Sequence, residues 1–229
     1  EMRLVTGVQT CALPILVTLA TATTTFKSKM VPFPTIVTFA DPELQAAICN
    51  WVWPYKAPGS PIYMSDITTS VSVLHKSLFI SGYNNIKSLE GMQVFKDTGL
   101  ENLSINGADL SDLSPLSSLT SLKYLDLGNN SITNISPLAS LTNLENILLG
   151  SIDPGSGLPG NPSNPYIYRT NDIPDLSPLS NLTKLVKVEL MNNQHLVNIA
   201  PLSGLALQVL GIRSTEIGKS TRLNSSHKT

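Results

Sequence analysis

The chain has 229 residues, a formal net charge of −1 and 14% charged residues. This length suits one or two domains with a sizeable hydrophobic core. The near-neutral charge argues against nucleic acid as the main partner. No apolar run reaches the ~18 residues that indicate a transmembrane helix, so the sequence shows no complete membrane span.

The two ends of the chain are related in a way that does not concern folding. A DNA string that encodes residues 5–13 gives, as its reverse complement, codons for residues 219–227. Both peptides resemble translated sequencing-adapter DNA, read once in each orientation. We therefore expect residues 1–15 and 218–229 to be adapter-derived, and leave them out of the fold as one leaves out a tag. We then expect the natural protein to extend beyond both ends.

Residues 16–38 begin with a short apolar run. The run passes into Ala20-Thr-Ala22, which resembles the small-residue cleavage site at the end of a secretory signal peptide. The alternative is an arbitrary hydrophobic stretch. We predict that residues 16–38 hold a signal-peptide remnant and a linker, which implies a secreted or cell-surface protein.

Residues 39–77 have the features of an N-terminal cap. Asp41 is a good N-cap for a helix over 39–52, and Pro42 suits its first helical position. A second cap element is predicted over 67–74. Such elements cover the open core of a terminal repeat. The apolar face of the first helix is Leu44, Ala47, Ile48 and Trp51.

Residues 78–217 carry a repeat of 22 residues with the spacing L-x-x-L-x-L, which is the leucine-rich-repeat signature. An imperfect first copy uses Leu78, Ile80, Ile86, Leu89 and Met92. Four full copies follow, and every apolar slot in them holds Leu, Ile or Val. The slots are Leu100, Leu103, Ile105, Leu110, Leu113, Leu116, Leu119; Leu122, Leu125, Leu127, Ile132, Ile135, Leu138, Leu141; Leu144, Ile147, Leu149, Ile173, Leu176, Leu179, Leu182; and Leu185, Val188, Leu190, Leu196, Ile199, Leu202, Leu205.

The spacing within each copy predicts a short strand and a short return. Leu125 and Leu127 alternate with period two, so one face of their strand is buried. Asn130 follows, and a buried amide can satisfy backbone groups where the chain leaves the strand. A proline recurs on the return path, at Pro137 for example, which excludes a regular helix and favours 3₁₀ turns.

An insertion, placed at 151–172, interrupts the third full repeat. It is rich in Pro, Gly, Ser and Asn, and it ends with Tyr166, Tyr168 and Arg169. Long loops are often functional, and Tyr and Arg are common anchors of recognition. The alternative is a tolerated surface insertion.

The sequence contains no motif for catalysis. It has no paired cysteine motif, no histidine pair at metal-ligand spacing and no glycine-rich phosphate loop. Cys49 on the cap helix suits a small buried hydrophobe, and His195 suits a turn. We predict that the chain is not an enzyme and has no cofactor or metal.

The cap helix, the segment 86–92 and the 22-residue Ser-Pro-Leu repeats together resemble the internalin class of bacterial leucine-rich-repeat surface proteins, over residues 39–213. The resemblance implies a secreted or wall-attached protein whose concave strand face binds a host or cell-surface partner. The chain departs from the pattern at Ala108 and Ile152, where an asparagine is expected, so the asparagine ladder should be broken there. No binding residue can be transferred, because the exposed strand positions vary within the class.

The fold predicted is therefore an α/β repeat, a right-handed leucine-rich-repeat solenoid with a parallel sheet on its concave face and an N-terminal helical cap. The first functional hypothesis is a non-enzymatic binding module for a protein or glycan, without nucleic acid as partner. The alternative is a targeting or spacer domain of a larger surface enzyme.

Candidate ligand-binding residues alternate with the buried strand leucines or end the insertion. Tyr124 and Leu148 are expected on adjacent strands, as an apolar patch that the insertion could wall. The full set is Ser77, Phe79, Ser81, Asn102, Ser104, Asn106, Tyr124, Asp126, Asn146, Leu148, Lys187, Glu189 and Met191, with Tyr166, Tyr168 and Arg169 from the insertion.

Overall fold

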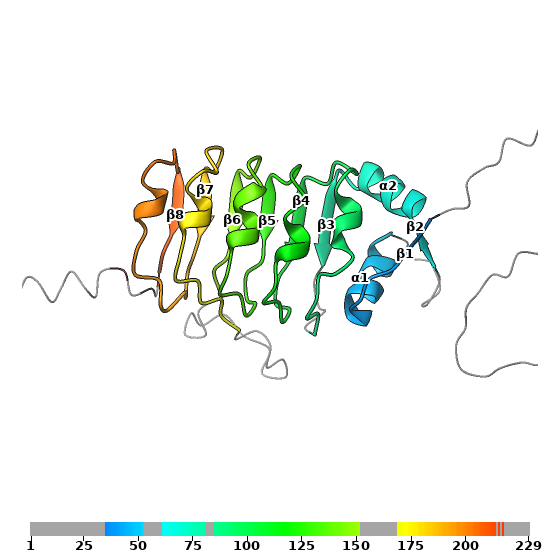
Figure 1. Cartoon of the computed structure of the whole chain (residues 1–229), viewed down its shortest axis with the longest axis horizontal. Helices are drawn as coiled ribbons and strands as arrows, with labels where there is room; N and C mark the ends of the chain where they lie inside the picture. The colour runs from blue at the N-terminus through cyan, green and yellow to red at the C-terminus, as the bar shows by residue number, and fades with distance from the viewer. Residues whose placement is uncertain are drawn as a thin grey trace, which may run out of the picture.

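The structure is a computed structural model that describes residues 35–52, 61–80, 85–151, 169–213, 215 and 217. The predicted adapter segments, the signal-peptide remnant, Ser81, Tyr166 and Tyr168 lie outside these residues. The described part is a row of repeats with two helices at its N-terminal end (Figure 1).

One parallel sheet runs the length of the row, and its strands follow one another in sequence order. Its strands are β3 (Ser77–Ile80), β4 (Asn102–Ile105), β5 (Tyr124–Asp126), β6 (Asn146–Leu148), β7 (Lys187–Glu189) and β8 (Val209–Gly211). Leu103, Leu125 and Ile147 are in register, so the buried strand positions of successive repeats stack on one another. Stacking gives each repeat the burial and backbone pairing that it could not supply alone.

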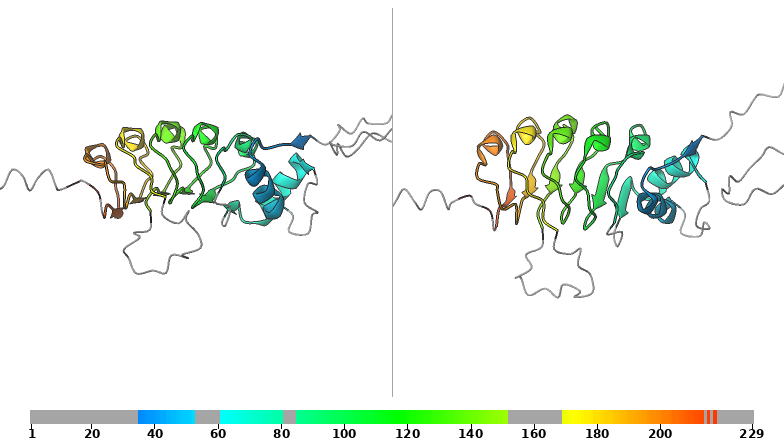
Figure 2. Two further views of the ribbon diagram at one scale, coloured as in Figure 1. Left: turned by 90° about the horizontal axis from the view of Figure 1, so that it is seen from below. Right: turned by 60° about the horizontal axis from the view of Figure 1, so that its bottom comes forward.

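A short 3₁₀ helix forms the opposite side of each repeat (Figure 2). These helices are η1 (Met92–Phe95), η2 (Ser114–Leu116), η3 (Ser136–Ser140), η5 (Ser177–Leu179) and η6 (Ala200–Leu202). An Asp or Asn two residues before the helix accepts a hydrogen bond from its first backbone N–H, at 2.9 Å for both Asp112 to Ser114 and Asn134 to Ser136. This turn, with proline at the second helical position, keeps the return short.

The core lies between the sheet and the 3₁₀ helices. All the predicted apolar slots are buried except Ile199 and Leu205, which are partly buried in the last repeat. The described residues therefore confirm the leucine-rich-repeat solenoid with its parallel sheet. At the far end Leu210 of β8 is 37% exposed, whereas the matching Leu125 is fully buried.

A ladder of asparagines braces the turns after the strands. The amide of Asn130 donates to the backbone carbonyls of Ile105 and Leu127, and its oxygen accepts from the N–H of Leu110. Asn193 donates in the same way to the carbonyl of Leu190. Each buried amide thus satisfies backbone groups of two successive turns.

The expectation that the ladder breaks at Ile152 was wrong. Asn171, on the far side of the insertion, donates to the carbonyls of Leu127 and Leu149 at 2.9 Å. It is fully buried, so it takes the ladder position of the third full repeat. Ser151 is also buried. The insertion therefore covers 152–170 rather than 151–172, because both flanking residues belong to the repeat.

The N-terminal cap contains α1 (Pro42–Val52) and α2 (Met64–Val73). The predicted apolar face of α1 is buried, with Leu44 and Ile48 fully so, and the indole of Trp51 donates to the carbonyl of Ser77 at 3.1 Å. This hydrogen bond ties α1 to the first strand of the sheet.

The cap also begins earlier than the predicted boundary at residue 39. A two-residue strand, β1 (Ile36–Val37), pairs antiparallel with β2 (Ile62–Tyr63) just before α2. Val37 is buried, and the N–H of Ala40 donates to the carbonyl of Glu90 in the first repeat. Two strand residues give too little periodicity to be recognised in a sequence.

Asp41 joins the cap to the repeats. One oxygen of its carboxylate accepts from the N–H groups of Glu43 and Leu44, as the predicted N-cap. The other accepts from the N–H groups of Lys87 and Ser88 in the first repeat. Burial raises the pKa of the Asp41 carboxyl, but these four donors outweigh burial and leave that pKa below its ordinary value.

Candidate binding face

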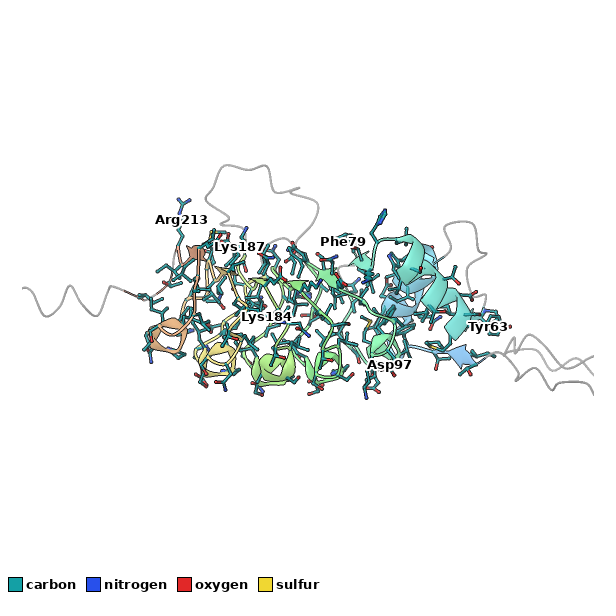
Figure 3. The ribbon with its side chains drawn as sticks, turned by 90° about the horizontal axis from the view of Figure 1, so that it is seen from above. Tyr63, Phe79, Asp97, Lys184, Lys187 and Arg213 are labelled. Atoms are coloured by element: carbon teal, nitrogen blue, oxygen red, sulfur yellow. The ribbon has the colours of Figure 1, made fainter. Side chains whose placement is uncertain are left out.

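The side chains that alternate with the buried strand residues lie on the face of the sheet that points away from the 3₁₀ helices, which we call the open face. Figure 3 shows Phe79 and Lys187 on this side. The backbone register arranges the predicted residues in two rows across the strands. The first row is Ser77, Asn102, Tyr124, Asn146 and Lys187, and the second is Phe79, Ser104, Asp126, Leu148 and Glu189.

Asp126 is the centre of a hydrogen-bond network on the open face. Its carboxylate accepts from the hydroxyl of Ser104, the amide of Asn106 and the backbone N–H of Gly128, at 3.0–3.1 Å. The oxygen of Asn106 accepts in turn from the amide of Asn129 at 2.9 Å. The Asp126 carboxylate is therefore occupied by the protein itself, and these bonds brace the ends of β4 and β5.

Charged side chains near the central strands are also paired. The ammonium of Lys187 lies 3.3 Å from the carboxylate of Glu189 on the same strand. At the edge where the strands begin, Glu101 contacts the ammonium groups of Lys76 and Lys123, at 2.6 and 3.0 Å. Hydrogen bonds from these two lysines lower the pKa of Glu101, so it stays ionised. The charges at the central strands are thus paired, whereas the exposed Arg213 just after β8, on the same side in Figure 3, has no ion pair among the described residues.

Tyr124 and Asn146 keep polar groups available for a ligand. They are partners in register on β5 and β6, both half-buried, and among the described residues neither side chain has a hydrogen-bond partner. Burial and the nearby charge of Asp126 raise the pKa of the Tyr124 phenol, which therefore remains protonated and can donate. An amide beside it can both donate and accept.

Leu148 and Met191 continue this group diagonally across the sheet. Tyr124 lies in the first row on β5 and Leu148 in the second row on β6, while Met191 lies two residues beyond the second row of β7. All three are half-buried. Diagonal neighbours on adjacent strands are roughly 7–8 Å apart, which is within reach of long and aromatic side chains. We call this line of three side chains the diagonal stripe.

Two positions beside the diagonal stripe are glycines because the next turn packs closely against their backbone. A Cβ on Gly128 would lie 2.6 Å from the carbonyl oxygen of Gly150. A Cβ on Gly150 would lie 2.7 Å from the backbone nitrogen of Met191. Any larger residue at either position would collide with the next turn. No side chain therefore covers the backbone at these two positions.

Other predicted residues lie apart from the diagonal stripe. Phe79, 58% exposed, is on the strand next to the cap. Arg169 lies outside both rows, because its guanidinium is 2.7 Å from the carboxylate of Asp109 in the turn after β4. Val209, 45% exposed in the first row of β8, was missed, because the last strand falls after the fourth full copy of the repeat.

Metal-binding side chains do not gather among the described residues. No group of three or more potential metal-binding side chains occurs among them. His195 Nδ1 lies 2.6 Å from the carboxylate of Asp172, at the surface of a turn, as expected for a turn-forming residue. None of the described helices is long and apolar enough to cross a membrane.

Comparison with known proteins supports the class of fold. A family model described as leucine-rich repeats, in two copies, matches residues 98–140 and 120–159. No curated protein sequence gives a significant match. The fold is that of a leucine-rich-repeat protein.

The resemblance to internalins is supported by a solved structure. An internalin (inlF) of Listeria monocytogenes is 28% identical, with a TM-score of 0.62 over 78% of this chain. A leucine-rich-repeat protein of Leptospira interrogans is 24% identical, with a TM-score of 0.49 over 68% of this chain and 36% of its own. The chain spans 45% of the internalin structure. The chain is thus similar to an internalin in sequence and in fold.

Proposed function

We propose that the chain is the ligand-binding module of a secreted or cell-surface bacterial protein, and that its ligand is a protein. Leucine-rich repeats generally bind proteins, and the chain is similar to an internalin. The observation that carries the proposal is the diagonal stripe, in which Tyr124, Leu148 and Met191 stand beside the free amide of Asn146.

The chemistry of the open face favours a protein over a charged glycan. The Asp126 carboxylate is occupied by Ser104, Asn106 and Gly128, and Lys187 is paired with Glu189. What remains is apolar surface with a phenol and an amide, the mixture that occurs at the centre of protein interfaces. Binding hot spots are enriched in Tyr, in pockets from which water is excluded.

A pair of surface variants tests the proposal. Wild-type protein and Tyr124→Ala/Leu148→Asp would be immobilised and exposed to surface-protein extracts from bacteria and from candidate host cells. We expect a protein retained by the wild type to bind the double variant at least about tenfold more weakly, because two anchors are lost. Affinity would be measured with the purified partner.

Ser117→Ala provides the control, because Ser117 is exposed at the end of η2 on the opposite side. Its affinity should equal that of the wild type. Circular dichroism would show that both variants keep the fold. Equal binding by the wild type and the double variant would place the ligand elsewhere, and no retained protein would favour the spacer role.

A further inference from the structure

The turn after β4 has no asparagine of its own at the ladder position, unlike the turns of the following repeats. Ala108 holds the ladder position there and is fully buried. A methyl group can neither donate to a carbonyl nor accept from an N–H. Asn130 of the next repeat donates to its own Leu127, and it also donates to Ile105 and accepts from Leu110 at the two ends of the turn after β4.

An arginine from a later repeat reaches this turn from outside. Nη1 of Arg169 donates to the carbonyl oxygen of Ala108 at 3.0 Å and lies 2.7 Å from Oδ1 of Asp109. Ser131, in the turn after β5, donates its hydroxyl to the same Oδ1 of Asp109 at 3.1 Å. One carboxylate therefore connects three successive turns.

The cation of this bridge is better shielded than the cation of any other ion pair among the described residues. The side chains of Arg169 and Asp109 are 21% and 29% exposed, against 53% for Lys76 in its pair with Glu101. Partial burial strengthens a charge-assisted hydrogen bond and reduces its screening by salt. A planar guanidinium can also bind a carboxylate and a carbonyl oxygen at once.

The braced turn is connected to the open face. Asn106 lies two residues before Ala108, and its amide donates to the Asp126 carboxylate at 3.1 Å. Gly107 between them has φ = 77°, a conformation that glycine adopts without strain, and its N–H donates to the carbonyl of Gly128. The position of Asn106 therefore depends on how firmly this turn is held.

We propose that Arg169 is a strap. It holds the turn 106–109 from outside. Among the described turns after β4–β7, this is the turn that has no ladder asparagine of its own and is braced from inside by Asn130 of the next turn alone. The strap thereby positions Asn106 in the Asp126 network. Arg169 is a positioning residue in this account and not the ligand anchor that its place at the end of the insertion indicated. The inference does not depend on the proposed binding function, because it concerns the free protein.

Amide hydrogen exchange of the full chain tests the strap directly. The wild type, Arg169→Lys and Arg169→Met would be compared in peptides that cover residues 104–110, at low salt and at about 0.5 M NaCl. Methionine keeps much of the apolar stem but removes the charge and the donors. We expect exchange there to be at least about fivefold faster in Arg169→Met, with Arg169→Lys intermediate.

Salt provides a second readout. High salt should speed exchange in the wild type by a smaller factor than Arg169→Met does, because the pair is only partly exposed, and should leave exchange in Arg169→Met unchanged. Glu101→Gln is the control, because it removes an exposed ion-pair partner at the other edge of the sheet and should not alter exchange at 104–110. Wild-type protection in Arg169→Met would overturn the proposal, and so would exchange that salt changes equally in both proteins.

Discussion

Asn171 accepts a hydrogen bond from the backbone N–H of Ile132 at 3.0 Å, as Asn130 accepts one from Leu110 at 3.2 Å. The two asparagines therefore hold equivalent places in successive repeats, although the insertion separates Asn171 from its own strand. When the insertion is left out, Gly150-Ser151 runs on into Asn171-Asp172-Ile173. This string matches the turn 128–132 of the preceding repeat, position for position.

The first prediction is that the insertion can be removed. Deleting residues 152–170 joins Ser151 to Asn171 and leaves a repeat of the regular length, so the variant should fold with a melting temperature within a few degrees of the wild type. The deletion also removes Arg169, so exchange at 104–110 should rise as in Arg169→Met. Differential scanning calorimetry checks the stability, and loss of the cooperative transition would contradict the equivalence.

The second prediction concerns the ladder. Asn171→Ala leaves the carbonyls of Leu127 and Leu149 without this donor in a fully buried position. The two carbonyls keep a donor each, from Asn130 and Asn193, but the buried N–H of Ile132 loses its acceptor. The cost should be about 1–3 kcal/mol in urea denaturation, the cost of one unsatisfied buried group. Asn181→Ala is the matched control, because Asn181 is exposed, and it should cost less than about 0.5 kcal/mol. Equal effects would show that Asn171 does not brace the turn.

The third prediction compares two equivalent strand leucines. Leu125→Ala removes a fully buried side chain between two packed repeats and should cost about 2–5 kcal/mol. Leu210→Ala removes the matching side chain of β8, which is 37% exposed, and should cost less than about 1.5 kcal/mol. Both values come from chemical denaturation, and similar costs would mean that the last repeat packs as tightly as the middle ones.

Replacing Asp126, beside Leu125, should cost more stability than its surface position indicates. The sequence alone favours a cost below about 0.5 kcal/mol for Asp126→Ala, as for an ordinary surface residue. Because its carboxylate accepts from Ser104, Asn106 and Gly128, a cost of about 1–2 kcal/mol is expected instead. A measured cost near zero would show that the network adds no stability.

The fourth prediction is a pH dependence that arises at Asp41. The pKa of this carboxyl is lower in the folded chain than its ordinary value, so ionised Asp41 stabilises the fold above the unfolded pKa of about 4. That contribution is lost as the pH falls through the lower, folded pKa. Asp41→Asn should therefore lose about 1–3 kcal/mol at pH 7.

The difference between Asp41→Asn and the wild type should shrink below about pH 4, where the wild-type carboxyl also becomes neutral. Urea denaturation at a series of pH values measures it. The physical reason is that an amide nitrogen cannot accept from the N–H groups of Lys87 and Ser88. A difference that stays constant from pH 7 to pH 3 would contradict the role of the charge.

The sequence by itself determined the repeat and therefore the sheet. Leu103, Leu125 and Ile147 recur at a fixed spacing, and a strand with one buried face follows from their alternation. The same holds for the N-cap at Asp41 and for the outward direction of Tyr124 and Leu148. Each is a local feature, because it depends on the spacing of a few neighbouring residues. These parts of the fold and of the open face could be read without any contact between repeats.

Only the tertiary structure decided which distant residues meet. Asn171 enters the ladder, Arg169 reaches back to Asp109, and Asp126 is occupied by Ser104 and Asn106. Each of these contacts joins different turns of the solenoid, so it depends on how the repeats stack and on the length of the insertion. A spacing pattern shows which face a side chain takes, but the stacking of the repeats determines the partner it finds there.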